Sequence, residues 1–414
     1  MTAPTPDGTL RRRLGLSDAV VVGLTAMLGA GAFGAFGPAA AAGGAGMLVG
    51  LGLAAVVALC NATSSARLAA VHPESGGTYV YARHRLGPFW GYLAGWSFVV
   101  GKTASCAAMA LTFGAYAAPG HERLVAVVAV VALTAVSYRG VERTARVGRV
   151  IVVLTLATLT VVVVAALGGG TASGDHLLPF PGADARGILQ SAGLLFFAFA
   201  GYARIATLGE EVRDPARTIP RAVAVALGVV LAVYAVVATS ALLAVGPDAL
   251  ATSSAPLRTV VEAGSLAGLA PVVQVGAAVA SLGALLGLGL GVSRTALAMA
   301  RDGHLPGTLA AVHPRFRTPH HAELAVAVVV VLLVLAVDLR GAIGFSSFLV
   351  LTYYALANAS ALRMRSDERR PARWVPALGL VGCAALALTV VPAAVVGGLV
   401  VLAAGCVAWA VRRR

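Results

Sequence analysis

The fold is decided by two interrupted apolar stretches, Ala26-Met27-Leu28-Gly29-Ala30-Gly31-Ala32-Phe33-Gly34 and Phe196-Phe197-Ala198-Phe199-Ala200-Gly201-Tyr202-Ala203-Arg204. Each stretch lies midway through a segment that is long enough to cross a bilayer. Glycines weaken a helix there, and lipid offers no substitute hydrogen bonds to the freed backbone groups. A membrane chain tolerates such a weak point where the freed backbone groups face a cavity and bind a ligand. Two such interruptions in corresponding places of a membrane chain indicate a ligand site near the bilayer midplane.

The composition excludes an ordinary soluble domain. Of the 414 residues, 59% are hydrophobic and 12% are charged, whereas charged residues make up about 25% of a soluble domain. Apolar segments of about 20 residues recur along the chain, and each is typical of a membrane helix. We therefore predict an all-α integral membrane protein with twelve transmembrane helices, at 17–38, 45–65, 88–117, 122–138, 147–168, 187–207, 220–245, 271–297, 322–338, 343–362, 374–391 and 393–411.

The net charge of +14 is a topology signal and does not indicate a nucleic-acid partner. Arginines cluster before segment 1 and after each even-numbered segment. The loops on the other side hold only Arg123, Arg186, Arg258 and Arg340. Because loops rich in Lys and Arg stay in the cytoplasm, both termini are predicted to be cytoplasmic. This asymmetry also supports an even number of spans.

The twelve segments divide into repeats. Segments 1–5 and 6–10 form two five-helix halves, and an odd number of spans per half forces the halves into opposite orientations. The resulting 5+5 inverted repeat, with broken helices 1 and 6, is common in transporters and places the site between the halves. The predicted organisation is a cytoplasmic tail (1–16), a first repeat (17–168), a second repeat (187–365) and two C-terminal helices (374–411).

No catalytic or cofactor chemistry is visible in the chain. The four cysteines lie in apolar segments without metal-ligand spacing, and the eight histidines lie in loops. A membrane enzyme would need clustered polar groups within its spans. We expect no enzyme activity, no cofactor and no metal site. A channel is disfavoured because the chain shows no filter-like repeat, and a sensor without transport stays an alternative. No oligomeric state is predicted.

Four motifs resemble those of the amino acid–polyamine–organocation (APC) superfamily of permeases, which has the LeuT-type architecture. The similarity covers segments 1 to 10. It is carried by Gly29-Ala30-Gly31-Ala32-Phe33, by Pro73-Glu74-Ser75-Gly76-Gly77-Thr78-Tyr79-Val80-Tyr81, by Phe196–Tyr202 continuing to Pro215–Arg221, and by Ser293-Arg294 through Asp302-Gly303. The resemblance implies uptake or exchange of amino acids or related amines by alternating access. Alanine-rich and arginine-rich usage is typical of a high-GC bacterial genome and implies a plasma membrane location.

The two interruptions predict how a substrate is held. A half-helix that starts after the first break presents free N–H groups to a carboxylate, while carbonyls before it and in segment 6 accept from an ammonium group. A zwitterionic amino acid thus fits without a charged side chain. Phe199 and Tyr202 are the candidate aromatic lid and wall. The predicted substrate-binding residues are Ala26, Met27, Gly29, Ala30, Gly31, Phe197, Phe199, Ala200, Gly201 and Tyr202, with Cys106 and Met109 of segment 3 lining a side-chain pocket. The alternative is that the glycines only allow close helix packing.

Lys102 is the only lysine in the chain and lies within segment 3. An ionisable residue inside a membrane helix is a functional-site hypothesis, and a lysine, unlike an arginine, is able to lose its proton when desolvated. Lys102 is therefore the candidate proton-coupling or cation-mimicking group, the alternative being a lysine that snorkels to the interface. Some proton-coupled members of the resembled family carry a lysine in span 5. Here an approximate match puts Thr155 at that place, so Thr155 as a sodium ligand, or uncoupled exchange, stays open.

The cytoplasmic end of segment 6 supplies candidate gate residues. Arg204 follows the second interruption, and Glu210 and Glu211 lie at the predicted membrane boundary, where they are able to pair with loop arginines as an inner gate. A solvated loop with surface ion pairs is the alternative. The inferred pocket contains no acidic residue, which favours a neutral substrate over a cationic one. The sequence thus predicts a secondary transporter of neutral amino acids, coupled to protons or to sodium, with an exchanger or exporter as the alternative.

Overall fold

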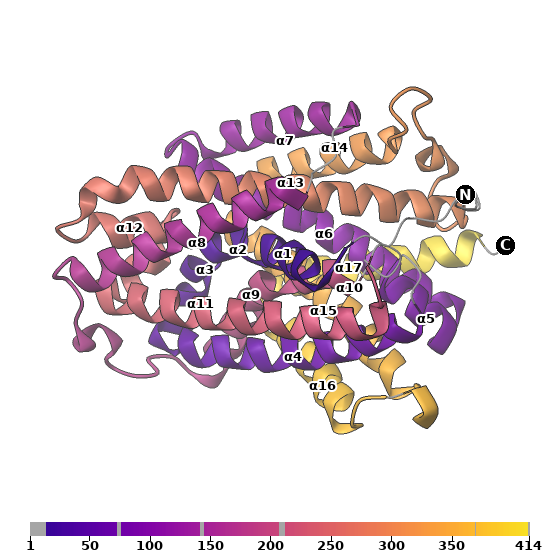
Figure 1. The fold of residues 1–414 in the computed structure, drawn as a ribbon, viewed down its shortest axis with the longest axis horizontal. Helices are drawn as coiled ribbons and strands as arrows, with labels where there is room; N and C mark the ends of the chain where they lie inside the picture. The colour runs from indigo at the N-terminus through magenta and orange to yellow at the C-terminus, as the bar shows by residue number, and fades with distance from the viewer. Residues whose placement is uncertain (1–13, 73–75, 141–144, 207–211, 369, 413–414) are drawn as a thin grey trace, which may run out of the picture.

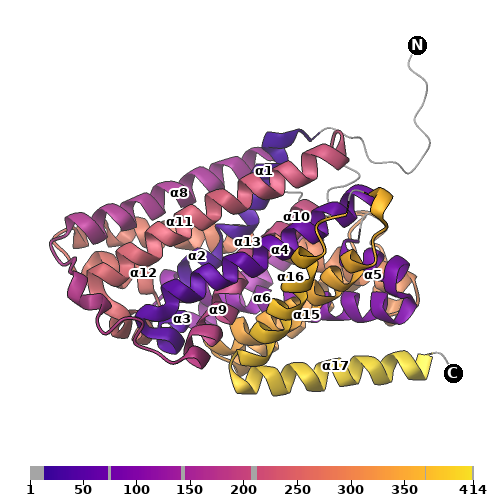
Figure 2. The same ribbon diagram turned by 90° about the horizontal axis from the view of Figure 1, so that it is seen from below.

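The computed structural model describes residues 14–72, 76–140, 145–206, 212–368 and 370–412, and every regular element in these ranges is a helix. The long helices form one bundle, and most of them run along its longest axis (Figure 1). Turning the bundle shows that the last helix, α17, lies along one outer edge (Figure 2). The predicted all-helical class is confirmed for the described part of the chain.

The first half of the chain contains both short and long helices. The short ones surround the first interruption, and the long ones are the apolar segments 2 to 5. In chain order they are α1 (Leu16–Met27), α2 (Ala30–Gly34), α3 (Phe36–Gly43), η1 (Gly44–Gly46), α4 (Met47–Val71), α5 (Thr78–Leu86), α6 (Pro88–Ala117), α7 (Glu122–Tyr138) and α8 (Ala145–Gly168).

The second half begins with another interrupted segment and ends with two helices outside the predicted repeat. Short 3₁₀ turns mark the loops between the long helices. In chain order they are η2 (Gly174–Leu177), α9 (Ala185–Phe199), η3 (Ala200–Tyr202), α10 (Ala203–Ala206), α11 (Pro215–Thr252), α12 (Pro256–Glu262), η4 (Ala267–Leu269), α13 (Ala270–Arg301), η5 (Gly307–Ala310), α14 (His320–Ala336), α15 (Leu339–Leu362), η6 (Ser366–Glu368), α16 (Trp374–Thr389) and α17 (Pro392–Arg412).

Within the described ranges, nine stretches are long and apolar enough to cross a membrane. They correspond to predicted segments 1, 2, 3, 5, 6, 7, 8, 10 and 12. The other three segments fall on the shorter helices α7 and α14, of 17 residues each, and α16, of 16 residues. The protein is therefore a multi-pass membrane protein, while the count of twelve spans and the inverted repeat stay predictions.

Two helices form the centre of the bundle. In the most apolar stretches of α6 and of α15, 78% of the residues are buried, against 17% in α17. Small residues allow α6 and α15 to approach closely: a Cβ on Gly101 would lie 2.8 Å from Leu349 Cβ. The Ser105 and Ser346 hydroxyls are 2.6 Å apart in the same contact. Small residues and polar pairs of this kind hold membrane helices together, so α6 is a fixed wall against which a site can be built.

The long helix α11 is bent where its sequence requires it. Gly246 has φ 74° and ψ 172° inside the helix, and Pro247 follows it. A positive φ suits glycine, and proline supplies no N–H to continue the helical hydrogen bonds. The apolar part of α11 therefore ends where the predicted segment 220–245 ends.

Three remote segments are tied together at one end of the bundle, on the right of Figure 1. The Tyr79 hydroxyl on α5 donates to the Asp302 carboxylate, which also pairs with Arg83 at 3.0 Å. Arg412 of α17 donates to the Gly303 carbonyl at 3.0 Å. The ends of α13 and α17 and the helix α5 thus share the end that the arginine pattern predicts to be cytoplasmic.

A second ion pair fixes α5 and gives a pH-dependent prediction. Arg85 donates to Glu368 at 2.5 Å, and this hydrogen bond lowers the pKa of the Glu368 carboxyl. A carboxyl whose pKa is lower in the folded state stabilises the fold above its unfolded pKa, and this stabilisation disappears as the pH falls through the folded value. We expect Glu368→Gln to lower the thermal stability at neutral pH by at most about 1 kcal/mol, with the gap from wild type closing below about pH 4.

Thermal unfolding of the detergent-purified protein across a pH series measures this gap. Asp367→Asn is the matched control, because the Asp367 side chain is 71% exposed and lies 3.6 Å from Arg365. A gap that widens on acidification would contradict the expected sign.

Candidate functional site

The first interruption separates α1 from α2. Helix α1 ends at Met27, Leu28 has φ −77° and ψ 26°, and Gly29 has φ −88° and ψ −139° before α2 begins at Ala30. The extended turn at Gly29 changes the direction of the chain inside an otherwise apolar span. The backbone groups around Met27 and Ala30 are consequently outside a regular helical ladder.

The second interruption has a different form. Helix α9 ends at Phe199 and passes through the 3₁₀ turn η3 into α10. The backbone is tightened here and is not extended as at Gly29: Ala200 has φ −65° and ψ 1°. Segment 6 is therefore interrupted by a local change of helical pitch, without an extended residue. A 3₁₀ turn within a helix is common at functional hinges.

Glycines bring the two interruptions into contact. A Cβ on Gly31 would lie 2.7 Å from the Ala198 Cα atom, and one on Gly201 would lie 2.6 Å from the backbone carbonyl of Ala26. Both distances are below ordinary van der Waals contact, so only glycine fits at either position. The close packing that the sequence offered as an alternative is present at these glycines, and it joins α1–α2 to α9–η3.

Two tyrosines that the sequence analysis missed donate hydrogen bonds to backbone carbonyls at the two interruptions. The Tyr234 hydroxyl lies 2.6 Å from the Met27 carbonyl and 3.2 Å from that of Ala198. The Tyr354 hydroxyl donates to the Ala200 carbonyl at 3.1 Å. Both side chains are fully buried. A tyrosine within an apolar span, as here in α11 and α15, is a signal for such a role because its hydroxyl needs a partner when buried.

Lys102 reaches the same place from α6. Its side chain is buried, and its Nζ atom donates to the Ala200 carbonyl at 3.2 Å. That carbonyl therefore accepts from Lys102 and from Tyr354 together. Within the described part of the chain, no carboxylate forms an ion pair with Lys102. The snorkelling alternative does not describe this geometry, since the ammonium group points to the second interruption.

Four of the predicted binding residues gather in one small apolar cluster, separate from the main core. They are Ala30 of α2, Cys106 and Met109 of α6, and Phe197 of α9. Leu194, Ala284, Leu285 and Ile343 belong to the same cluster, which we call the interruption cluster. Its members come from seven helices, α2, α6, α7, α9, α13, α14 and α15. Met109 and Phe197 are each 8% exposed. The sequence had no means of finding the contributions of α13 and α15.

The two residues predicted as the aromatic lid and wall lie outside this cluster. Phe199 and Tyr202 are fully buried members of the main core. The Phe199 ring meets that of Tyr234 at 5.3 Å between centroids, and the Tyr202 ring meets that of Tyr354 at 5.0 Å. These rings therefore pack against the two tyrosines that donate hydrogen bonds to the carbonyls at the interruptions.

The remaining predicted residues are placed as follows. Thr155 is buried on α8, and its hydroxyl donates to the Ile151 carbonyl of its own helix at 2.7 Å. Arg204 is half-buried on α10. Glu210 and Glu211 lie outside the described residues. A gate formed by these three charged residues stays a prediction.

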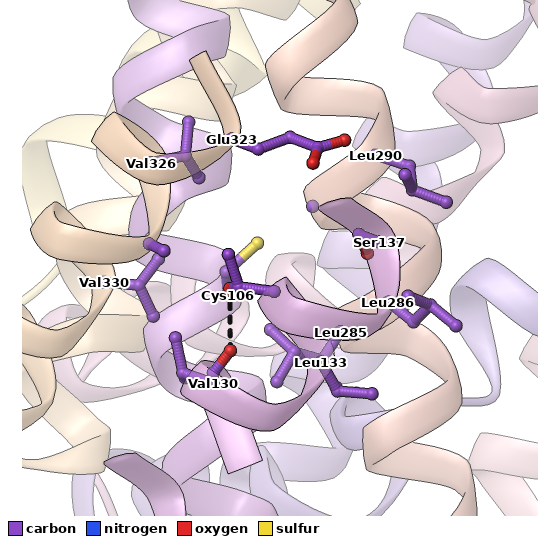
Figure 3. A pocket seen from close by; sticks show the side chains of 13 residues that line it. Cys106, Val130, Leu133, Ser137, Leu285, Leu286, Leu290, Glu323, Val326 and Val330 are labelled. Atoms are coloured by element: carbon purple, nitrogen blue, oxygen red, sulfur yellow. Dashed lines mark hydrogen bonds between the residues drawn. The ribbon is translucent and has the colours of Figure 1, made fainter. Parts of the chain in front are cut away.

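An acidic residue that the sequence analysis did not single out lies outside the predicted binding residues. Glu323 is buried in the first turn of α14 and lines a separate cavity that also borders Cys106 (Figure 3). The signal available in the sequence was a single carboxylate beside a continuous apolar run. Its burial depends on α7 and α13, which cover it.

Comparison with known proteins agrees with the geometry. Residues 14–410 match a family described as amino acid permease. The chain is 62% identical to an uncharacterized transporter of Mycobacterium tuberculosis, over 98% of this chain and 92% of that protein. It is 25% identical to the branched-chain amino acid permease BcaP of Bacillus subtilis, over 78% of this chain and 74% of that protein. It is 26% identical to the serine/threonine exchanger SteT of Bacillus subtilis, over 90% of this chain and 88% of that protein. The motifs, the bundle of apolar helices with its interrupted spans and these matches together identify the chain as a member of the amino acid permease family, a membrane transporter of the APC superfamily and not an enzyme.

Proposed function

We propose that this transporter carries neutral, zwitterionic amino acids across the plasma membrane by alternating access. The observation that carries the proposal is the meeting of the two interruptions at Gly31 and Gly201, beside an apolar cluster. Backbone dipoles at interrupted spans suit both charges of a zwitterion. The apolar cluster next to them suits an uncharged side chain.

The proposed binding mode uses backbone groups from both halves. The substrate carboxylate binds the amide groups that follow Gly29, and the substrate ammonium binds carbonyls at Met27 and around Ala200. In the described geometry these carbonyls accept from Tyr234, Tyr354 and Lys102. The substrate therefore competes with side-chain donors for the same carbonyl oxygens. Because Tyr234 bonds to carbonyls of both α1 and α9, substrate binding would weaken the contact between these helices.

The interruption cluster supports a neutral aliphatic side chain. Ala30, Met109 and Phe197 contribute apolar surface, and burying such a surface favours a matching apolar ligand. BcaP is named a branched-chain amino acid permease and SteT a serine/threonine exchanger. Neutral amino acids of this size are the substrates we propose here, with exchange as the alternative to net uptake.

Coupling and topology are part of the proposal. We assign Lys102 as the coupling group, either as a proton carrier or as a fixed cation, and Thr155 as the candidate ligand if sodium is the coupled ion. Arg204, Glu210 and Glu211 form the proposed inner gate. Both termini face the cytoplasm, and residues 17–168 and 187–365 form the two inverted repeats.

Binding of candidate substrates gives the first test. We expect L-leucine and L-serine to raise the thermal stability of the purified protein, and L-arginine to leave it unchanged. A ligand at about 100 times its Kd adds about 2.7 kcal/mol of apparent stability. Uptake of the stabilising amino acid into proteoliposomes, with and without the same amino acid inside, then separates net transport from exchange. Stabilisation by L-arginine alone would contradict a neutral substrate.

A further inference from the structure

A small cavity lies between α6, α7, α13 and α14, close to the interruption cluster (Figure 3). Its volume is about 50 Å³. Most of its walls are apolar, and its polar lining comes from Glu323, Ser137, Thr134 and Cys106. On this measure a water needs at least about 10–15 Å³, and it needs polar partners. The cavity therefore has room for water beside a carboxylate.

Glu323 is the unusual member of this lining. The residue is 5% exposed, and neither of its carboxylate oxygens has a hydrogen-bond partner among the described residues. Figure 3 shows the side chain extending from α14 into the space between Val326 and Leu290. Burying a carboxylate without a partner is costly, and native proteins leave few buried polar groups unsatisfied. A buried carboxylate of this kind is stabilised by binding a proton, a water or an ion.

The groups around Glu323 do not neutralise it. From α13, Arg294 acts on it electrostatically without a hydrogen bond to either oxygen. Cys106 of α6 and Ser137 and Thr134 of α7 also line the cavity. The Thr134 hydroxyl donates to the Val130 carbonyl at 2.7 Å. Two histidines start α14, the helix that carries Glu323. The His320 ring packs on Tyr138 with centroids 5.9 Å apart, and its Nδ1 atom has no hydrogen-bond partner among the described residues, whereas His321 Nδ1 lies 2.9 Å from the Thr308 carbonyl in η5.

The cavity and the interruption cluster share a wall. Cys106, Val130, Leu285 and Val330 belong to both. Cys106 lies one helical turn beyond Lys102, whose ammonium group holds the Ala200 carbonyl. The walls of the cavity that holds Glu323 therefore include side chains of the interruption cluster. A change of packing in that cluster would alter these walls.

We propose that Glu323 is a second ionisable site of the transport cycle, one that binds a proton in one conformation and releases it in another. The inference rests on the proposed transport function. The carboxylate accepts one proton from bulk solvent, which a water in the cavity relays as hydronium and is left as water, and it becomes a neutral carboxyl group. When the walls open, the carboxyl group gives that proton to water, which leaves the carboxylate and hydronium. A cation such as Ca²⁺ takes about six to eight oxygen ligands, which is more than the Glu323 carboxylate and the hydroxyls of Ser137 and Thr134 supply. A proton needs only the carboxylate and a water.

Glu323→Gln tests the proposal in proteoliposomes that contain no substrate and are supplied from outside with L-leucine, or with whichever amino acid stabilises the protein, while preloaded vesicles measure exchange. For one proton per substrate, a pH gradient of one unit supports up to about tenfold accumulation. We expect wild type to accumulate substrate under this gradient and Glu323→Gln to reach only the external concentration, while substrate exchange continues and no longer varies with pH. Glu262→Gln is the matched control, because Glu262 is an exposed residue of α12 paired with Arg258 at 2.6 Å. Unchanged gradient-driven accumulation in Glu323→Gln would overturn the proposal, and so would accumulation driven by a sodium gradient alone.

A pair of glycine variants tests the cavity if Glu323→Gln does not fold. Gly289 and Gly291 both lie on α13, and a Cβ at either position meets nothing within 4 Å. Gly289 lines the cavity and Gly291 does not. Gly289→Val should therefore fill the space and slow gradient-driven uptake, whereas Gly291→Val should resemble wild type. Equal behaviour of the two variants would contradict a role for the cavity.

Infrared spectroscopy separates this inference from the proposed function. The carbonyl band of a protonated carboxyl group that titrates in wild type should be missing in Glu323→Gln. This measurement needs no substrate, so it holds even if none of the amino acids tested is transported. If wild type transports amino acids and the titrating band persists in Glu323→Gln, the proton site is wrong and the transport function stands.

Discussion

Gly201→Ala is expected to abolish transport. The added Cβ would lie 2.6 Å from both the carbonyl carbon and the carbonyl oxygen of Ala26. These are backbone atoms, so the clash cannot be relieved by a change of rotamer, and η3 must move away from α1. Overpacking of this kind costs about 1–3 kcal/mol. A displacement of about 1 Å in a site can reduce a rate by about 100-fold, so transport should suffer far more than folding.

The control for this prediction is another glycine-to-alanine change in a helix. Gly228 lies on the exposed side of α11, and a Cβ there meets nothing within 4 Å. Gly228→Ala should keep full transport and gain up to about 1 kcal/mol from the better helix propensity of alanine. Proteoliposome uptake and thermal unfolding of both variants make the comparison. Wild-type transport by Gly201→Ala would show that the two interruptions need not touch, and the proposed site would then be wrong.

Lys102→Met is expected to lose transport while keeping its stability. The variant removes the charged donor to the Ala200 carbonyl, and hydrogen bonds to charged groups contribute about 1.5–3 kcal/mol. If the Lys102 hydrogen bond keeps η3 in the geometry that transport requires, the uptake rate should fall by roughly 10-fold to 100-fold. Stability should be unchanged or higher, because replacing a buried charge by an apolar side chain of similar volume is often neutral or stabilising. A residue that serves the fold alone would show the opposite pattern.

Tyr354→Phe provides the matched comparison, since it removes the other donor to the same carbonyl. A neutral hydrogen bond contributes about 0.5–1.5 kcal/mol, so this variant should lose no more than about tenfold in rate. The pH dependence of uptake distinguishes the two forms of the Lys102 proposal: a proton carrier gives a flat profile in Lys102→Met, and a fixed cation leaves the profile in place. A wild-type rate and profile in Lys102→Met would remove Lys102 from coupling altogether.

Local chemistry explains why part of the site was predictable. Glycines within apolar runs mark places where a helix is weak, and the interruption at Gly29 lies where the sequence predicts it. Ala30, Cys106, Met109 and Phe197 were proposed from their position beside these glycines or on segment 3, and they are found in one cluster. The single lysine was conspicuous for a similar reason, since a charge inside an apolar span is costly wherever it points.

Other parts of the site depended on partners from remote segments. The sequence offered the carbonyls of Met27 and of segment 6 as hydrogen-bond acceptors for a ligand. It gave no sign that Tyr234 and Tyr354 already donate to the carbonyls of Met27 and Ala200. Phe199 and Tyr202 look equivalent to Phe197 in the sequence, yet the rotation of α9 and η3 turns them into the main core.

By itself, the sequence determined that this is a multi-pass helical membrane protein of the amino acid permease family, and where its first span is interrupted. These are consequences of hydropathy, charge asymmetry and glycine placement, which act locally along the chain. Only the tertiary structure decided which backbone carbonyls accept hydrogen bonds from side chains and which aromatic rings belong to the interruption cluster. It also decided that Glu323 is buried with no hydrogen-bond partner among the described residues. The physical reason is that burial and hydrogen bonding depend on neighbours in space, and those neighbours come from helices 98 to 207 residues away in the chain.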